Sequence, residues 1–132
     1  MDFNDTPDEA AFRAEARGWL AANAEPRGPG SFETWPARYG DAEGLRRARD
    51  FQRRKAEGGL AAITWPREYG GRGGTAIQQV IYNQEEARYF VPRGYFEIGL
   101  GMCMPTLMTY ATEAQKQRYV PRALTAEEIW CQ

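Results

Sequence analysis

Three threonine-led segments, each typical of the start of a helix, constrain the fold of this chain more than any other feature. Thr6 precedes a proline at the first helical position and a glutamate three residues after the cap, a pattern that predicts a capping box. Thr75 and Thr112 open two further predicted helices, the latter in the segment Thr112-Glu113-Ala114-Gln115. Helix starts at these three points predict a mainly helical chain.

The first predicted helix should end before Pro26, because a proline disfavours helical backbone at the residue before it. Its apolar face consists of Phe12, Ala16, Trp19 and Leu20. Residues 26–40 form a predicted loop rich in proline, glycine and aromatic residues. A second helix is expected from about Asp41 to Glu57, ending at Gly58-Gly59.

The second predicted helix carries a basic cluster made of Arg46, Arg47, Arg49, Arg53, Arg54 and Lys55. Acidic residues stand four positions from several of these, in the pairs Glu43–Arg47, Arg46–Asp50, Asp50–Arg54 and Arg53–Glu57. This spacing favours a solvated, internally paired face over an anion-binding patch.

The third predicted helix begins at Thr75, is bounded by Pro92, and has its apolar positions at Ile77, Val80, Ile81 and Ala87. Residues 95–108 then alternate between apolar side chains and Glu97, Gly99, Gly101 and Cys103, which is the period of a strand. Their length and the scarcity of β-branched residues favour a buried helix instead, so both interpretations stay open. The last helix is expected to end near Val120, before Pro121.

The composition of the chain excludes several classes of function. Its 132 residues suffice for one domain with its own core, and 17 basic against 18 acidic side chains argue against a nucleic-acid binder. Histidine is absent, which excludes Ser-His and Cys-His nucleophile pairs and most zinc sites, so no metal site is expected. Two distant cysteines and the lack of a long apolar run predict a soluble, cytoplasmic protein without a membrane span.

The glycine cluster after Tyr69 formally fits a dinucleotide-binding fingerprint, Gly71-x-Gly73-x-x-Ala76, ahead of a helix. That motif requires a strand leading directly into the glycine turn, whereas Pro66 and the polar residues 67–69 stand there. We interpret the glycines as a surface turn with positive φ angles, and a nucleotide-binding enzyme as a distant alternative.

Three glutamates of the sequence are candidates for a catalytic role. Glu85 and Glu86 point about 100° apart on a helix, so they cannot flank one substrate bond, and we expect one of them to make a polar core or partner contact. Glu97 is the stronger candidate, because it is a single carboxylate among apolar side chains in a segment loosened by glycines. The alternative is that Glu97 turns to solvent or meets an arginine.

Four motifs follow one another along the chain. They are Trp65-Pro66-Arg67-Glu68-Tyr69-Gly70-Gly71-Arg72-Gly73, Glu85-Glu86, the segment Thr112-Glu113-Ala114-Gln115-Lys116-Gln117-Arg118-Tyr119-Val120-Pro121, and Glu127-Glu128-Ile129-Trp130-Cys131-Gln132. In this order they resemble the N-terminal helical domain of the acyl-CoA dehydrogenase family over nearly the whole chain. Ala111 and Ala126 depart from the pattern, since the family usually has glycine there.

The resemblance implies a fold and a chemistry. The fold is an all-α N-terminal helical bundle over residues 1–132, ending at the start of a β-rich middle domain that this sequence lacks. The chemistry is that of a flavoprotein oxidoreductase of fatty acid metabolism, in which a glutamate takes the α-proton of an acyl-CoA while the β-hydrogen passes as hydride to FAD. Electron-transferring flavoprotein then reoxidises the flavin, and a homo- or hetero-oligomer is expected.

The same resemblance places neither the base nor most of the FAD site in this sequence, so no catalytic residue is assigned. Gln132 would be the first residue near the flavin. The acyl end of the substrate pocket would be lined by Gly94, Glu97, Ile98 and Gly101. The chain alone is therefore expected neither to bind FAD tightly nor to dehydrogenate acyl-CoA.

Two alternatives remain from the sequence. One is a free-standing helical subunit or binding module without activity of its own, although the apolar ending Ile129-Trp130-Cys131 favours truncation. The other is an acyl-CoA oxidase or flavin monooxygenase relative, which shares the helical domain and delivers electrons to oxygen.

Overall fold

The computed structural model describes residues 4–28 and 41–132, and most of these residues are helical. The α-helices are α1 (Pro7–Asn23), α2 (Ala42–Glu57), α3 (Ala76–Glu86), α4 (Met104–Tyr110) and α5 (Glu113–Leu124). Shorter turns are the 3₁₀ helices η1 (Arg67–Tyr69) and η2 (Arg93–Tyr95) and the π-helix η3 (Gly99–Cys103). The all-α prediction is confirmed, and of the predicted loop at 26–40 residues 29–40 lie outside the described residues.

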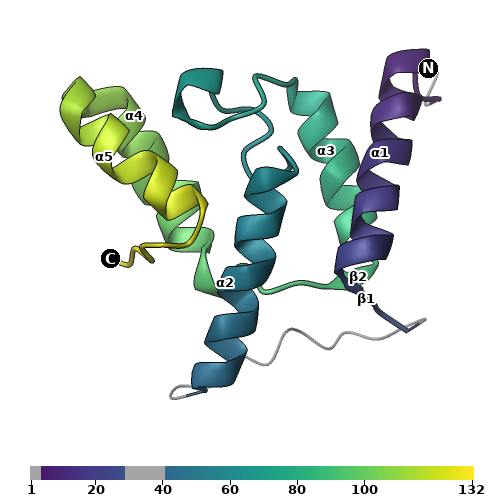
Figure 1. Cartoon of the computed structure of the whole chain (residues 1–132). Helices are drawn as coiled ribbons and strands as arrows, with labels where there is room; N and C mark the ends of the chain where they lie inside the picture. The colour runs from purple at the N-terminus through teal and green to yellow at the C-terminus, as the bar shows by residue number, and fades with distance from the viewer. Residues whose placement is uncertain (1–3, 29–40) are drawn as a thin grey trace.

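The helices are arranged in two groups on either side of α2 (Figure 1). On one side α1 and α3 lie next to each other, and on the other side α4 packs with α5. Two-residue strands β1 (Glu25–Pro26) and β2 (Tyr89–Phe90) pair antiparallel and tie the end of α1 to the chain that leaves α3. The segment after β2 crosses α2 part-way along that helix on its way to α4, and Phe96 of this segment packs with Ala48 of α2 (Figure 1).

All three threonine-led helix starts are confirmed as capping boxes. The hydroxyl oxygen of each threonine accepts a hydrogen bond from the backbone N–H three residues later, at 3.3 Å for Thr6, 3.2 Å for Thr75 and 3.3 Å for Thr112. In return the side chain at that third position accepts from the threonine N–H at 2.7, 2.9 and 3.0 Å. These bonds satisfy N–H groups that a helix start otherwise leaves unpaired, which fixes where each helix begins.

Within residues 4–28 and 41–132 the core consists of three small clusters rather than one. The first, between α1, α3 and the chain after α2, contains Phe12, Ala16, Leu20, Leu60, Ile63, Ile81 and Tyr82. The second contains Tyr69, Met104, Val120 and Ala123, and the third contains Ala48, Phe96 and Ala126. The predicted apolar face of α1 is thus confirmed, with Trp19 packed partly buried at its edge.

The apolar face predicted for the third helix is partly wrong. Ile77 and Val80 are each 47% exposed, whereas the inner face of α3 consists of Ile81, Tyr82, Glu85 and Glu86. Two carboxylates lie inward because cations of α1 and α2 meet them there. Hydrophobic spacing alone could not predict a helix face stabilised by ion pairs.

Two further expectations are settled by packing. Residues 99–110 are helical, so the strand interpretation is wrong; Leu100 and Met104 both pack in the second cluster, one helical turn apart. The last helix runs through Pro121 to Leu124 rather than ending near Val120. Ala123 and Leu124 are buried, and this burial offsets the backbone hydrogen bond that Pro121 does not donate.

The glycine turn between Trp65 and Gly74 is a surface turn, as predicted. Gly70 (φ +86°) and Gly73 (φ +64°) adopt left-handed backbone, and Gly71 lies so close to the Trp65 carbonyl that a Cβ would overlap it. The 3₁₀ helix η1 precedes the turn, and among the described residues no strand leads into it. The dinucleotide-binding alternative is therefore excluded.

Candidate functional site

A pocket of about 440 Å³ lies between α2, α3 and the segment from Val91 to Gly101. Its apolar lining consists of Phe51, Ala61, Ala62, Trp65, Val91, Pro92, Phe96 and Leu100. Its polar lining consists of Gln52, Lys55, Gln79, Asn83, Glu86, Arg93 and Glu97, and Gly101 also borders it. An apolar pocket with a few convergent polar groups is the usual form of a small-molecule site.

An ion set centred on a buried carboxylate forms part of the polar lining of this pocket. Lys55 Nζ donates to Glu86 Oε1 at 2.6 Å, and Arg93 donates through Nε to Glu86 Oε2 at 2.7 Å and again through Nη2. The Glu86 side chain is 2% exposed and that of Lys55 is 15% exposed. Lys55 also lies 4.6 Å from the centre of the Tyr82 ring, a cation–π distance.

Glu86 remains a carboxylate despite its burial. Burial by itself would raise the pKa of Glu86, but the charges and hydrogen bonds of Lys55 and Arg93 outweigh it and hold that pKa below its usual value. The set therefore presents two cations around one carboxylate, rather than a carboxylic acid able to give up a proton.

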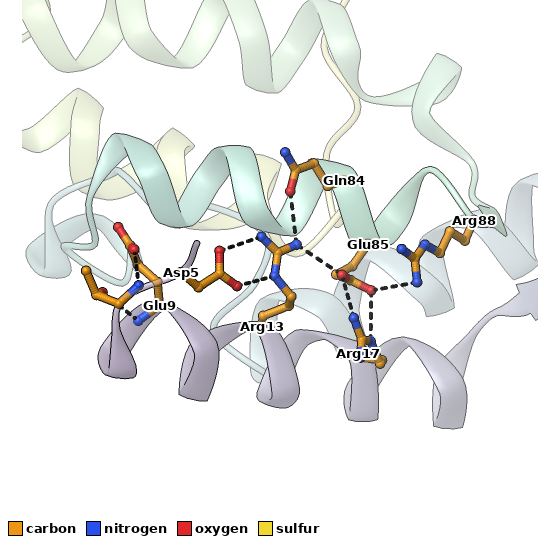
Figure 2. Close-up of polar contacts among 8 residues, drawn as sticks. Asp5, Glu9, Arg13, Arg17, Gln84, Glu85 and Arg88 are labelled. Atoms are coloured by element: carbon orange, nitrogen blue, oxygen red, sulfur yellow. Dashed lines mark hydrogen bonds and ion pairs between the residues drawn. The ribbon is translucent and has the colours of Figure 1, made fainter. Parts of the chain in front are cut away.

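The neighbouring Glu85 serves a different, structural purpose (Figure 2). Its side chain is 1% exposed and accepts from Arg13 Nη1 at 3.1 Å and from Arg17 Nε and Nη2 at 3.1 and 3.0 Å. Arg88 lies 3.5 Å away, and Arg13 in turn holds Asp5 and Gln84. Glu85 thus fastens α3 to α1, while Glu86 faces α2. The two carboxylates therefore have different partners, and both make buried ion contacts where we expected one.

The residues predicted to line the acyl end separate into two groups. Glu97 and Gly101 border the pocket, whereas Gly94 and Ile98 are not among its lining residues. A Cβ at Gly94 or Gly101 would meet open space. Gln132 is exposed at the end of the chain.

The expectation that Glu97 sits among apolar side chains is wrong, since Glu97 is exposed. The backbone between Arg93 and Cys103 turns helically, so Phe96 points into the core and its neighbour Glu97 does not. The alternative stated above, that Glu97 turns to solvent, describes its position.

Sequence reasoning missed Lys55, Glu86 and Arg93 as a group. The solvated-face interpretation holds for much of the α2 cluster: Arg46 lies 3.6 Å from Asp50 and Arg53 lies 4.0 Å from Glu57, both exposed pairs. Lys55 is the exception. The sequence contains one signal that sets Lys55 apart. Lys55 is one of only two lysines among 17 basic residues, and it follows Phe51 by one helical turn.

Two of the four predicted α2 pairs take a different form. Glu43 pairs with Arg46 at 2.6 Å, three positions away, and the charge of Arg47 also contributes to lowering the pKa of Glu43. Arg54 donates to the backbone oxygen of Asp50 and to Asn23 Oδ1 at 2.8 Å, and so contacts the end of α1.

Comparison with known proteins identifies the family. Residues 6–127 match the family described as "Acyl-CoA dehydrogenase, N-terminal domain". The chain belongs to this acyl-CoA dehydrogenase family. It is 37% identical over 130 residues to the acyl-CoA dehydrogenase IpdE1 of Mycobacterium tuberculosis, a match that covers 95% of this chain and 32% of the relative. The IpdE1 of Mycolicibacterium smegmatis is also 37% identical, over 92% of this chain and 31% of its own length.

Solved structures agree with this assignment. The chain resembles a chain of the ChsE4-ChsE5 complex from Mycobacterium tuberculosis with a TM-score of 0.67 and 26% identity, covering 96% of this chain and 30% of that one. It resembles a chain of the Tcur3481-Tcur3483 steroid ACAD with a TM-score of 0.63 and 25% identity, covering 98% of this chain and 32% of that one. The chain therefore spans about a third of the length of the acyl-CoA dehydrogenases it matches.

Residues 4–28 and 41–132 contain no group of three or more Cys, Asp or Glu side chains placed to hold a metal ion. In the same residues no helix is long and apolar enough to cross a bilayer.

Proposed function

We propose that residues 1–132 are the N-terminal helical part of an FAD-dependent acyl-CoA dehydrogenase and supply one wall of its acyl pocket. The reaction class is α,β-dehydrogenation of an acyl-CoA thioester. One observation carries the proposal: Glu97 and Gly101, assigned to the acyl end by family resemblance, border a pocket that has an apolar wall. Gly94 and Ile98 belong to the proposed wall by resemblance alone.

The physical contribution of this wall is to hold the acyl group and keep water away. Side chains such as Phe51, Trp65 and Leu100 offer apolar surface, which favours binding of a hydrocarbon group. Gly101 has no side chain, and the space beside it is open. A wall of this kind favours a bulky acyl group over a short one.

FAD belongs to the proposal through the family. When bound, FAD accepts the hydride that leaves the substrate. Gln132 is exposed and thus available to contact the flavin, and we propose that the rest of the cofactor site and the base lie in domains that follow in the full enzyme. The assignment of residues 1–132 as one N-terminal domain is likewise proposed from the family.

The proposed partners are an acyl-CoA substrate, electron-transferring flavoprotein and further subunits. Two similar structures, ChsE4-ChsE5 and Tcur3481-Tcur3483, carry the names of two components, which supports an oligomer for this protein. The two cysteines are unpaired, which supports the proposed cytoplasmic location.

A fusion experiment tests this function. Residues 1–132 are joined to the remaining two thirds of Mycobacterium tuberculosis IpdE1, and acyl-CoA-dependent reduction of an electron-acceptor dye is measured. We expect the fusion to hold FAD and reduce the dye, while the 132-residue chain alone and the IpdE1 remainder alone do neither. A folded fusion that binds FAD and oxidises no acyl-CoA would contradict the proposal, as would stoichiometric FAD on the 132-residue chain alone.

A further inference from the structure

The polar lining of the pocket contains N–H groups that donate no hydrogen bond to any acceptor among the described residues. Lys55 has three N–H groups, and among the described residues only Glu86 accepts from it. Arg93 binds Glu86 through Nε and Nη2, and its Nη1 has no acceptor in the described part of the chain. Both residues line the pocket together with Glu86.

The same pocket also has an apolar lining, which includes Phe51, Trp65, Phe96 and Leu100. A purely hydrocarbon ligand filling the pocket would bring carbon against Lys55 and remove the water that its N–H groups bind, which is unfavourable. A ligand with an acceptor atom at its far end satisfies these donors and keeps the apolar contact.

The charge around these donors selects the kind of acceptor. The charges of Lys55 and Arg93 are balanced by Glu86 within the ion set and by Glu97, which borders the pocket between η2 and η3. A free carboxylate on the ligand would approach two glutamates as well as two cations. A neutral oxygen accepts from Lys55 or Arg93 without that repulsion.

We infer that this pocket binds an acyl group whose far end carries a neutral oxygen, a ketone or a hydroxyl, and that Lys55 donates the hydrogen bond that recognises it. The acyl nature of the ligand rests on the proposed function. The preference for an oxygen-bearing end rests on the ion set alone.

The test compares two small probes that differ by one oxygen, 2-tetralone and its parent hydrocarbon tetralin. Their binding to the ¹⁵N-labelled 132-residue chain is followed by NMR titration. We expect 2-tetralone to bind about fivefold more tightly than tetralin, a ratio within the range of one net hydrogen bond. The backbone amides of Glu97 and Gly101 should shift on binding.

Matched variants locate the interaction. Lys55→Met keeps the aliphatic stem and should bring the affinity for 2-tetralone down to that for tetralin, whereas Arg53→Met, on the exposed face of α2, should keep the preference. Gly101→Leu should weaken both probes, and Gly18→Leu, an equally open helical glycine on α1, should weaken neither.

Several outcomes would overturn the inference. These are equal affinities for the two probes, no binding of either, a retained ketone preference in folded Lys55→Met, or tighter binding of tetralin-2-carboxylate than of 2-tetralone. If Lys55→Met does not fold, nuclear Overhauser contacts in the unmodified chain decide. Contacts between bound 2-tetralone and the Lys55 side chain support the inference, and bound ketone without them contradicts it.

Failure here and failure of the proposed function can be told apart. Probe binding requires neither FAD nor CoA, whereas dye reduction by the fusion requires both. An inactive fusion with an intact ketone preference removes the dehydrogenase proposal and leaves the oxygen-binding pocket.

Discussion

Lys55 Nζ lies 2.6 Å from Glu86 Oε1, and this contact joins α2 to α3 at the edge of the pocket. The two partners depend on it unequally. Glu86 retains Arg93 if Lys55 is removed, whereas the described structure shows no other anion on Lys55 if Glu86 is removed. In the described structure, removal of Glu86 therefore leaves a cation without its anion, whereas removal of Lys55 leaves a carboxylate that is still paired.

We predict that Glu86→Gln is more destabilising than Lys55→Met. Glu86→Gln leaves a mostly buried ammonium without its carboxylate and should lower the free energy of unfolding by about 3 kcal/mol. Lys55→Met keeps the packing of the stem and leaves Glu86 paired with Arg93, so its loss should be at least about 1 kcal/mol smaller. Urea unfolding of both variants at pH 7 measures this, and equal losses or the reverse order would contradict the asymmetry.

Glu85 predicts a pH dependence of stability. Its hydrogen bonds from Arg17, together with those from Arg13, outweigh its burial and lower the pKa of Glu85 in the folded chain. A carboxyl group with a lowered folded pKa stabilises fully above its unfolded pKa, about 4.3, and loses that contribution as the pH falls through the folded value. Glu85→Gln should therefore cost about 2 kcal/mol at pH 7, and the difference from the unmodified chain should shrink below about pH 4.3.

The control for this prediction is Glu43→Gln. Glu43 also pairs with an arginine, but both side chains are exposed, and such pairs contribute little to stability. Urea unfolding from pH 7 to pH 3 should show no measurable effect of Glu43→Gln. A loss in Glu85→Gln that is constant over this range would show that the charge of Glu85 is not what stabilises the chain.

The glycine turn predicts a steric effect at one position. A Cβ at Gly71 would overlap the carbonyl of Trp65, which is backbone and also accepts from Gly73 N–H at 2.9 Å. Gly71→Ala should therefore lower stability by about 3 kcal/mol. Gly18→Ala, in the middle of α1 with open space around it, should raise stability by about 0.5–1 kcal/mol. Thermal unfolding of the two variants measures both changes in stability. A neutral result for Gly71→Ala would contradict the steric effect.

Ala126 and Ala111 stand where the family usually has glycine, and replacing each by glycine should change the stability of the chain by a different amount. Ala126 has φ +61°, the left-handed region that disfavours alanine, whereas Ala111 has φ −79°. In Ala126→Gly the relief of this strain offsets the lost burial of a methyl group, so stability should change by less than about 0.5 kcal/mol. Ala111→Gly relieves no backbone strain and should lower stability by about 0.5–1 kcal/mol. A larger loss at position 126 than at position 111, by urea unfolding, would refute this account.

The sequence predicts the helices well because their starts are local. The bonds that make the boxes at Thr6, Thr75 and Thr112 join residues three positions apart, so they can be recognised without the fold. The end of α5 is not local. It depends on burial of Leu124, whose backbone oxygen accepts from Gln52 Nε2 at 2.9 Å, 72 residues away.

The candidate site was predictable only in part for the same reason. Family motifs lead to Glu97 and Gly101, which do border the pocket. Lys55 and Glu86 are separated by 31 residues, and only the fold, which places α2 and α3 around the same pocket, brings them together. Exposed pairs elsewhere on α2 follow helical spacing, so the one lysine that turns inward does not stand out from the pattern.

The central claim, that this chain supplies a wall of an acyl pocket, is tested most directly through Gly101. The measurement is kcat/KM of the IpdE1 fusion for a series of acyl-CoA substrates of increasing acyl size, with Gly101→Leu and Gly18→Leu compared. We predict that Gly101→Leu lowers kcat/KM by about tenfold for large acyl groups and leaves small ones unchanged, because the new side chain fills space that only the large groups need. Gly18→Leu should leave the whole series unchanged. An identical size profile for Gly101→Leu and the unmodified fusion would contradict the claim.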